Sequence, residues 1–483
     1  MSGPVLAQQQ RAKPITGHSP QDHHNCADAA LVAARPEALE APMADARGNS
    51  THAPGGADLL AVGFGMSVAM WALGYVGRLP GVEAPGPLLA VGFVAVLVAG
   101  GHLIGRATRR GALGGALAGA LTATLNLLVV LSLVRSDTTP HAPFSLASIP
   151  ATVLGTALVT AAAAAWGART PSPSTPNWTG RFAGVAAAAT LLLIGAGGLV
   201  TGREAGLSVP DWPASFGSNM FLYPLARMTG NIYYEHTHRL YGSLVGLTTF
   251  ALAIHLWRVD SRRWLRALAL AAVVGVVAQG SLGGLRVTLA DAGGGVHTAL
   301  AHHETTISAT LRVAHGVLGQ VFFGVIVLLA AATSRAWRAA PGVVASLDRS
   351  LALALVYALV GQLLLGALLR HLAVDAIYHI GAAGVVTLLA LFAGTRAWAL
   401  HTSPPLRASG VAVLLLVTLQ VLLGVGAWVA VSLSPPHDPT TFDALITTAH
   451  QTNGAALLAG AVLVAAFTHL PQAVPTQAPA ALA

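Results

Sequence analysis

Twelve apolar stretches, each about twenty residues long, constrain this 483-residue chain more than any other feature of its sequence. An α-helix rises about 1.5 Å per residue, so a helix of this length crosses about 30 Å of hydrocarbon. Only 9% of the residues are charged, against roughly 25% in a soluble domain. A soluble enzyme, a disordered scaffold and a secreted disulfide-stapled domain are therefore excluded, and the sequence predicts an all-α polytopic membrane protein. The predicted helices lie near 58–78, 86–105, 112–134, 148–167, 182–202, 237–257, 265–285, 312–333, 350–369, 376–395, 409–430 and 445–468.

Polar segments divide these helices into groups. The N-terminal segment contains no sustained apolar run, which is typical of a disordered leader. A segment rich in Pro, Ser and Thr follows the fourth predicted helix and is expected to be a linker. The predicted organisation is a leader at 1–56, an extra four-helix block at 57–168, a linker at 169–181, a first bundle at 182–335, a second bundle at 336–470 and a tail at 471–483.

The net charge of +8 comes from scattered arginines rather than from a basic stripe, so no nucleic-acid partner is expected. If the leader lies inside, the inner loops hold 14 arginines and the outer side holds 8. This bias favours a multi-pass protein with both termini in the cytoplasm, as in a bacterial plasma membrane. Because Cys26 is the only cysteine, an internal disulfide and a cysteine-based metal site are excluded.

The last eight predicted helices contain an internal duplication. His238 and His379 are separated by 141 residues, and so are Gln279 and Gln420. A third pair of histidines, at 315 and 450, is separated by 135 residues. Two tandem four-helix bundles, related by duplication and preceded by four extra transmembrane helices, explain these offsets better than chance does.

Each predicted bundle carries two histidines at a matched position. His238, His315, His379 and His450 lie in the first turn or two of helices that start at the outer face, roughly 3–9 Å inside the boundary. Two imidazoles that face each other across a bundle are what six-coordinate haem iron requires. One such histidine alone could equally cap or bridge helices, but four in duplicate register favour haem ligation.

One carboxylate accompanies the first of these histidines. Glu235 precedes His238 by three residues and shares its helix face. It is a candidate proton donor or acceptor beside the first iron, and the alternative is that it favours the start of its helix. Since its counterpart in the second repeat is Ala376, we expect a reactive first site and a purely redox second site.

Other polar residues are expected at the outer face. Four arginines are candidates for contacts with haem propionates, with snorkelling membrane anchors as the alternative; they are Arg203, Arg239, Arg286 and Arg370. Four further histidines are expected to be solvated loop residues: His236, His297, His302 and His303.

Residues 182–468 resemble the haem A synthase family. The matching stretches are Thr201-Gly-Arg-Glu-Ala-Gly-Leu-Ser-Val-Pro-Asp-Trp-Pro213, Glu235-His-Thr-His-Arg239, Gln279-Gly-Ser-Leu-Gly-Gly284 and the histidines at 315, 379 and 450. The extra four-helix block has no counterpart in the family, an outer-loop cysteine pair of some members is missing, and the outer loop at 370–376 is very short.

The resemblance implies that a ring methyl of haem O is oxidised to a formyl group, which gives haem A for cytochrome oxidase. His238 and His315 would bind the substrate haem, Glu235 would be the catalytic acid, and His379 and His450 would hold haem b as an electron relay. Partners would be haem O synthase and a membrane electron donor. The alternative is a di-haem b electron-transfer protein in the same lipid bilayer, which needs the four histidines but not Glu235.

Overall fold

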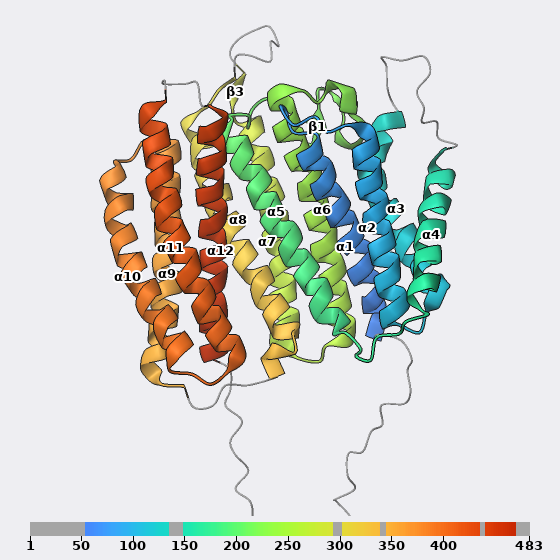
Figure 1. Ribbon diagram of the computed structural model, residues 1–483. Coiled ribbons are helices and arrows are strands. Elements are labelled where there is room, and N and C mark those ends of the chain that lie inside the picture. The colour runs from blue at the N-terminus through green and yellow to red at the C-terminus, as the bar shows by residue number, and fades with distance from the viewer. Residues whose placement is uncertain (1–53, 135–147, 293–301, 339–343, 435–439, 470–483) are drawn as a thin grey trace, which may run out of the picture. The chain divides into compact units, whose positions relative to one another are not determined.

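The computed structural model of the chain (Figure 1) describes residues 54–134, 148–292, 302–338, 344–434 and 440–469. In this part of the chain, twelve helices are long and apolar enough to cross a membrane, which confirms the predicted fold class. The helices are α1 (Ala57–Gly77), α2 (Gly86–Ala107), α3 (Gly111–Val134), α4 (Ser148–Gly167), α5 (Trp178–Gly202), α6 (Gly230–Val259), α7 (Arg263–Thr288), α8 (Thr306–Thr333), α9 (Ser346–Leu372), α10 (Ala376–Ala399), α11 (Pro404–Leu433) and α12 (Thr441–Thr468). Most of the expected leader, with Cys26, and the tail beyond 469 lie outside the described residues.

Several helices start earlier than the sequence predicted, because their first turns are polar. α6 begins at Gly230 rather than at 237, and α8 begins at Thr306 rather than at 312. α5 begins inside the expected linker, where the Asn177 side chain accepts a hydrogen bond from the Gly180 amide at 3.2 Å and caps the helix. An apolar-run criterion detects only the part of a helix that lies in hydrocarbon.

The earlier starts change the expected position of the histidines along their helices. His238, His315 and His450 lie eight or nine residues after the first residue of their helices, or about 12–13 Å along the axis. His379 lies only three residues after the start of α10. Measured from the first residue of each helix, the four histidines therefore do not share the common depth of one or two turns that the sequence predicted.

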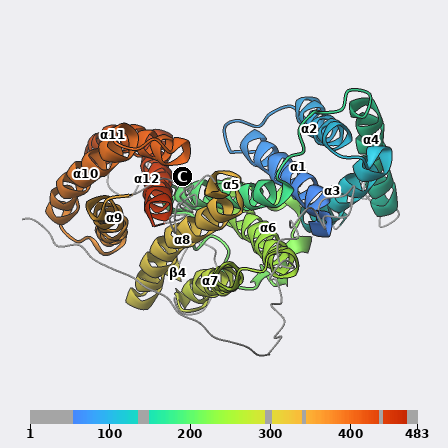
Figure 2. The same ribbon diagram turned by 90° about the horizontal axis from the view of Figure 1, so that it is seen from below.

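The eight C-terminal helices form two four-helix bundles of the same order (Figure 2). In the first bundle α5 and α7 each contact both α6 and α8. In the second, α9 and α11 each contact both α10 and α12. This equivalence is what the duplicated sequence predicted.

Helix α12 connects the second bundle to α5 and α8 of the first. Two glycines of α5, one turn apart, lie against it. A Cβ added at Gly198 would approach Thr448 Cγ2 to 2.8 Å, and one at Gly202 would approach Ala444 Cα to 2.9 Å. Small residues here let the two bundles pack closely within lipid.

The extra block α1–α4 packs through α1 against α5 and α6. Tyrosines with a polar tip make the contact, which suits helices packed in lipid. The Tyr233 hydroxyl donates to the carbonyl of Tyr75 at 2.6 Å, and the Tyr241 hydroxyl donates to that of Val68 at 3.2 Å. A buried tyrosine hydroxyl that has an acceptor costs little free energy, and the tyrosine ring fills the interface.

Short elements lie between the helices. Two hairpins cross the end of the first bundle where α6 and α8 begin, β1 (Ala214–Ser215) with β2 (Ser218–Asn219) and β3 (Asp291–Ala292) with β4 (His302–His303). The 3₁₀ helices are η1 (Pro54–Gly56), η2 (Met220–Leu222), η3 (Leu225–Arg227) and η4 (Ala336–Arg338).

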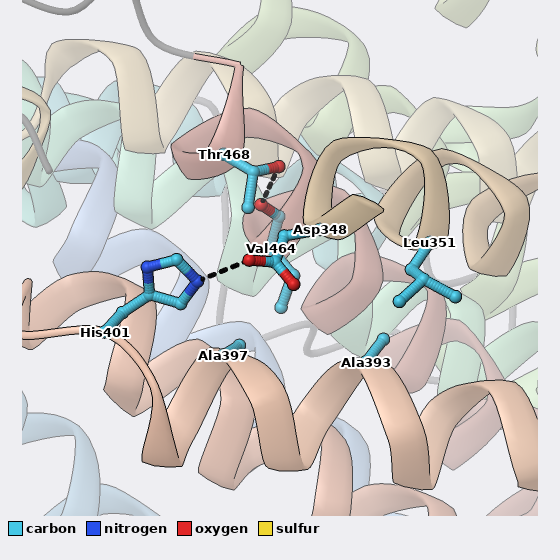
Figure 3. A pocket seen from close by; sticks show the side chains of 7 residues that line it. All are labelled: Asp348, Leu351, Ala393, Ala397, His401, Val464 and Thr468. Atoms are coloured by element: carbon cyan, nitrogen blue, oxygen red, sulfur yellow. Dashed lines mark hydrogen bonds and ion pairs between the residues drawn. The ribbon is translucent and has the colours of Figure 1, made fainter. Parts of the chain in front are cut away.

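The opposite end of the second bundle is held by a buried carboxylate (Figure 3). Asp348 Oδ1 pairs with Arg396 Nε at 2.5 Å. Asp348 Oδ2 lies 3.1 Å from His401 Nε2, the contact that Figure 3 shows. The cavity beside them, which Thr468 also lines, has a volume of about 10 Å³. This volume is about what one water needs, so we interpret the cluster as a structural tie between α9, α10 and the residues after α10.

Candidate functional site

The four predicted histidines form two pairs of nearly identical geometry. The ring centroids of His238 and His315 are 6.4 Å apart with the ring planes at 76°. Those of His379 and His450 are 6.3 Å apart at 77°. Each pair joins the second and fourth helices of its bundle, so the structure brings together the two histidines of each bundle that were predicted to face each other.

Each imidazole packs against a glycine of the preceding helix. A Cβ on that glycine would approach the imidazole Cε1 to 2.9–3.2 Å, closer than ordinary van der Waals contact. The four glycine–histidine contacts are Gly197 with His238, Gly283 with His315, Gly366 with His379 and Gly424 with His450. We call these glycines the imidazole seats, because any larger residue would displace the ring.

The spacing within each pair fits a haem iron. A nitrogen ligand lies about 2 Å from its metal and the ring centre roughly 1 Å behind it, so imidazoles on opposite sides of one metal have centres about 6 Å apart. Among the described residues, no group of three or more His, Cys, Asp or Glu side chains could hold a metal ion. Two imidazoles suffice for haem, because the macrocycle supplies the other four donors.

The two imidazoles of the first pair differ in their hydrogen bonds. His315 Nδ1 lies 3.1 Å from the Gln279 carbonyl oxygen, to which it can donate, and Gln279 Nε2 donates to the His315 carbonyl at 3.1 Å. A proton on Nδ1 leaves Nε2 as the ligand atom. His238 Nδ1 is buried and has no hydrogen-bond partner in the described part of the chain. The first pair thus combines one fixed imidazole with one held by packing alone.

Both imidazoles of the second pair have an amide beside them. Gln362 Nε2 lies 3.2 Å from His379 Nδ1 and donates to the His379 carbonyl at 2.9 Å. Gln420 Nε2 lies 3.2 Å from His450 Nδ1, and Asn453 Nδ2 donates to Gln420 Oε1 at 2.7 Å. The duplicated spacing had pointed to Gln420, but Gln362 and Asn453 had no sequence signal because neither has an equivalent in the first repeat.

Glu235 is almost completely buried, with 4% of its surface exposed. Its Oε1 pairs with Arg239 Nη2 at 2.5 Å, and its Oε2 accepts a hydrogen bond from the Val209 amide at 2.8 Å. Both carboxylate oxygens therefore have donors, one from its own helix and one from the loop between α5 and α6.

Arg239 holds the same loop. Its Nη1 donates to the carbonyls of Asp211 at 2.6 Å and Ala214 at 3.2 Å, and its Nη2 donates to that of Val209 at 3.0 Å. With Glu235, these acceptors account for all four terminal N–H groups of the guanidinium. This arrangement counts against the predicted contact of Arg239 with a propionate.

The loop that carries the Ser-Val-Pro-Asp-Trp-Pro sequence lies over the end of the first bundle. The Trp212 ring packs directly on Gly284 of α7, and Gly206 packs on the guanidinium of Arg286. Asp211 accepts hydrogen bonds from the amides of Phe216 and Gly217, both at 2.7 Å, which close the β1–β2 hairpin. In the described part of the second bundle, the connection between α9 and α10 is too short for a comparable cover, since only residues 373–375 separate the two helices.

The other predicted arginines lie at the same end of the bundles. Glu304 pairs with Arg286 at 3.2 Å and with Arg312 at 2.8 Å, and Arg370 Nη2 donates to the Thr201 carbonyl at 3.3 Å. Arg203 is the residue at the C-terminal cap of α5. Arg312 was not among the predicted site residues, and its pairing with Glu304 required the fold to be known.

One of the histidines predicted to be solvated is buried instead. His236 has no exposed surface, its Nδ1 lies 3.1 Å from Ser215 Oγ, and the Tyr223 ring is 5.0 Å away. The loop folds back over the start of α6, which a sequence pattern does not reveal. His302 and His303 form strand β4, and His297 lies outside the described residues.

Comparison with known proteins gives one match. Residues 180–380, about two fifths of the chain, match the family model described as cytochrome oxidase assembly protein. The matched segment contains the whole first bundle, α9 and the start of α10 with His379. No curated protein gives a significant match to the chain.

Proposed function

We propose that this chain, whose residues 180–380 match the family model described as cytochrome oxidase assembly protein, is a haem A synthase that oxidises a ring methyl of haem O to a formyl group. The match supports a role in cytochrome oxidase assembly. The observation that carries the finer proposal is the pair of equivalent two-histidine sites, of which the first has the buried carboxylate of Glu235 one helical turn before His238, where the second has Ala376 before His379.

In this proposal the two pairs have different tasks. His238 and His315 bind the substrate haem O, and His379 and His450 hold haem b. When bound, haem b supplies one-electron transfer. His315 is the better-oriented substrate ligand because the Gln279 carbonyl holds its Nδ1. His238, which lacks such a partner, is the ligand that we expect to exchange more easily.

The chain's own groups around the first pair orient the substrate and exclude water. The loop at 206–214 covers the site and is fixed by Arg239. Glu235, one helical turn from His238, is the proposed proton acceptor or donor at the substrate. Its bonds to Arg239 and to the Val209 amide link this proton-carrying group to the position of the loop.

The direct test uses cells that make haem O but lack their own haem A synthase. Expression of the chain should produce haem A, detected by chromatography of the extracted haems. Haem O that remains unchanged in cells with abundant, membrane-inserted protein would refute the proposed reaction.

A second candidate is a di-haem b electron-transfer protein, which the near-identity of the two pairs favours. A Glu235→Gln variant that keeps its haem spectrum but loses haem A production would support the haem A synthase over the electron-transfer protein. An unchanged haem A yield in this variant would contradict the catalytic role of Glu235. Because Glu235 also anchors the loop, Asp211→Ala serves as the matched control: it loosens the same loop at the β1–β2 hairpin but leaves the carboxylate in place. A loss that is equal in both variants would mean that Glu235 acts only through the loop.

The location and partners of the chain are part of the same proposal. We propose a plasma-membrane protein with cytoplasmic termini, in which both histidine pairs lie near the outer face and haem O synthase and a membrane electron donor are partners. Reporter fusions after α4 and after α8, both of which precede an inner loop in this orientation, should report the cytoplasmic side.

A further inference from the structure

A cavity of about 680 Å³ lies between the extra block and the first bundle. It is at the end of the helices opposite the histidine pairs, where α2 ends, α5 begins and α8 ends. Three arginines from these separate elements line it: Arg106 of α2, Arg181 of α5 and Arg335 just after α8. Nothing in the proposed haem chemistry uses this cavity.

Among the described residues, those that line the cavity include three arginines and no Asp or Glu, so this wall is cationic. Arg106 Nε donates to the Thr170 carbonyl at 3.0 Å, and Arg335 donates to the Thr175 carbonyl, so the segment after α4 holds both side chains in place. Arg181 lies with its guanidinium carbon 5.2 Å from the centre of the Trp178 ring. Each guanidinium has five N–H groups, so all three keep donors for an anion.

The wall along α2 carries two exposed apolar side chains, Ala99 and Leu103, with His102 between them. Leu103 and Ala99 line the cavity about one and two turns before Arg106, respectively, so they lie nearer the centre of the span. Both are exposed, and Leu103 has 40% of its surface accessible. The cavity thus passes from a row of apolar side chains at hydrocarbon depth to three arginines at the helix ends.

We propose that this cavity binds an anionic phospholipid, with its phosphate between Arg106, Arg181 and Arg335 and an acyl chain along Ala99 and Leu103. Arginine forks match phosphate oxygens with charge-assisted hydrogen bonds, and basic pockets between transmembrane helices are recurring sites for anionic headgroups. The apolar wall distinguishes this ligand from a soluble phosphate, which would have no use for it. The bound lipid would connect the extra block to the first bundle, since the arginines that contact its phosphate come from both.

The test measures lipid binding by the purified full-length chain in a neutral detergent. Native mass spectrometry counts bound phosphatidylglycerol, and thermal unfolding reports its effect, with phosphatidylcholine and inorganic phosphate as the comparison ligands. Phosphatidylglycerol alone should stay bound and raise the unfolding temperature. Neutralising one arginine should weaken its binding about fivefold, and Arg181→Glu should weaken it about 30-fold.

Two further variants make the outcome decisive. Arg258 is an exposed arginine near the C-terminal end of α6, at the same end of the bundle as the cavity but outside it. The Arg258→Glu variant should bind phosphatidylglycerol as the natural chain does. Ala99→Trp should reduce binding by filling the apolar wall while it leaves every charge in place. Equal binding of the two lipids, equal protection by inorganic phosphate, or unchanged binding in both Arg181→Glu and Ala99→Trp would each overturn the proposal.

Discussion

The imidazole seat at Gly366 offers a sharp test of the second haem site. A Cβ at this position would lie 2.9 Å from His379 Cε1 and 3.2 Å from its Nδ1. Carbon atoms in favourable contact are about 3.5–4.0 Å apart, so Gly366→Ala should force the ring away from α9 by roughly 0.6–1 Å. Site geometry has to be held to within about 0.5 Å, and therefore the displaced imidazole should no longer share one iron with His450.

The expected effect is a loss of haem b affinity without a loss of fold. Changes that disturb the support of a metal ligand cost about ten- to a hundredfold in affinity. Replacing a helical glycine by alanine adds up to about 1 kcal/mol of helix propensity, so the variant should unfold no more easily than the natural chain. The matched control is Gly361→Ala on the same helix, where nothing lies within 4 Å of the added Cβ.

The assay is a titration of haem b into haem-depleted, purified protein, followed by absorbance and by the low-spin electron paramagnetic resonance signal of bis-histidine iron. Gly361→Ala should bind as the natural chain does, and Gly366→Ala should bind weakly with a diminished low-spin signal. Equal affinities and equal signals for the two alanine variants would refute the role of the seat.

The remaining predictions concern the first site, the second bundle and one loop. Gly197→Ala should weaken haem O binding by about the same factor as Gly366→Ala weakens haem b binding. Gly195→Ala, whose Cβ would meet only a hydroxyl at 3.8 Å, should leave haem O binding unchanged. Equal haem O titration curves for the two variants would contradict this prediction. Asp348→Ala should lower the free energy of unfolding by about 2 kcal/mol, since the partly buried Arg396 and His401 lose their carboxylate partner, and a change below about 1 kcal/mol in denaturant unfolding in detergent would refute it. The hydrogen bond from Arg262 holds the pKa of Asp260 below its usual range. The Asp260 carboxylate therefore stabilises the fold at neutral pH, and this stabilisation is lost as the pH falls below about 4, through the lower folded-state pKa. Between pH 7 and 3, the thermal unfolding temperature of Asp260→Asn should fall less than that of the natural chain.

The twelve helices could be predicted from the sequence because a bilayer demands a continuous apolar length from each of them. The same criterion missed the first turns of α6 and α8, which contain polar residues. At α8 the Thr305 side chain accepts a hydrogen bond from the Ser308 amide at 3.1 Å. Such caps are worth about 1 kcal/mol and leave no trace in a hydropathy pattern.

The ligand candidates could be found because the duplication repeats their spacing, but their supports could not. Each seat glycine precedes its histidine by a different number of residues, 41 for His238 and 13 for His379, because loops of different length intervene. The partners of Arg239 are backbone carbonyls, whose positions depend on the folded loop and not on residue type. Contacts of this kind become visible only once the chain is folded.

The two histidine pairs share their geometry but differ in their surroundings, and this difference bears on which chemistry each could perform. A site that only passes electrons needs fixed ligands, and each imidazole of the second pair packs against an amide nitrogen that lies 3.2–3.4 Å from both ring nitrogens. A site that oxidises a substrate has to exclude water and let the substrate enter and leave. The first pair has a loop fixed by Arg239 and one imidazole, His238, without a hydrogen-bonded partner among the described residues. On our proposal, duplication supplied one ligand geometry twice, and the loop and the unsupported imidazole made the first copy suitable for a substrate that has to exchange.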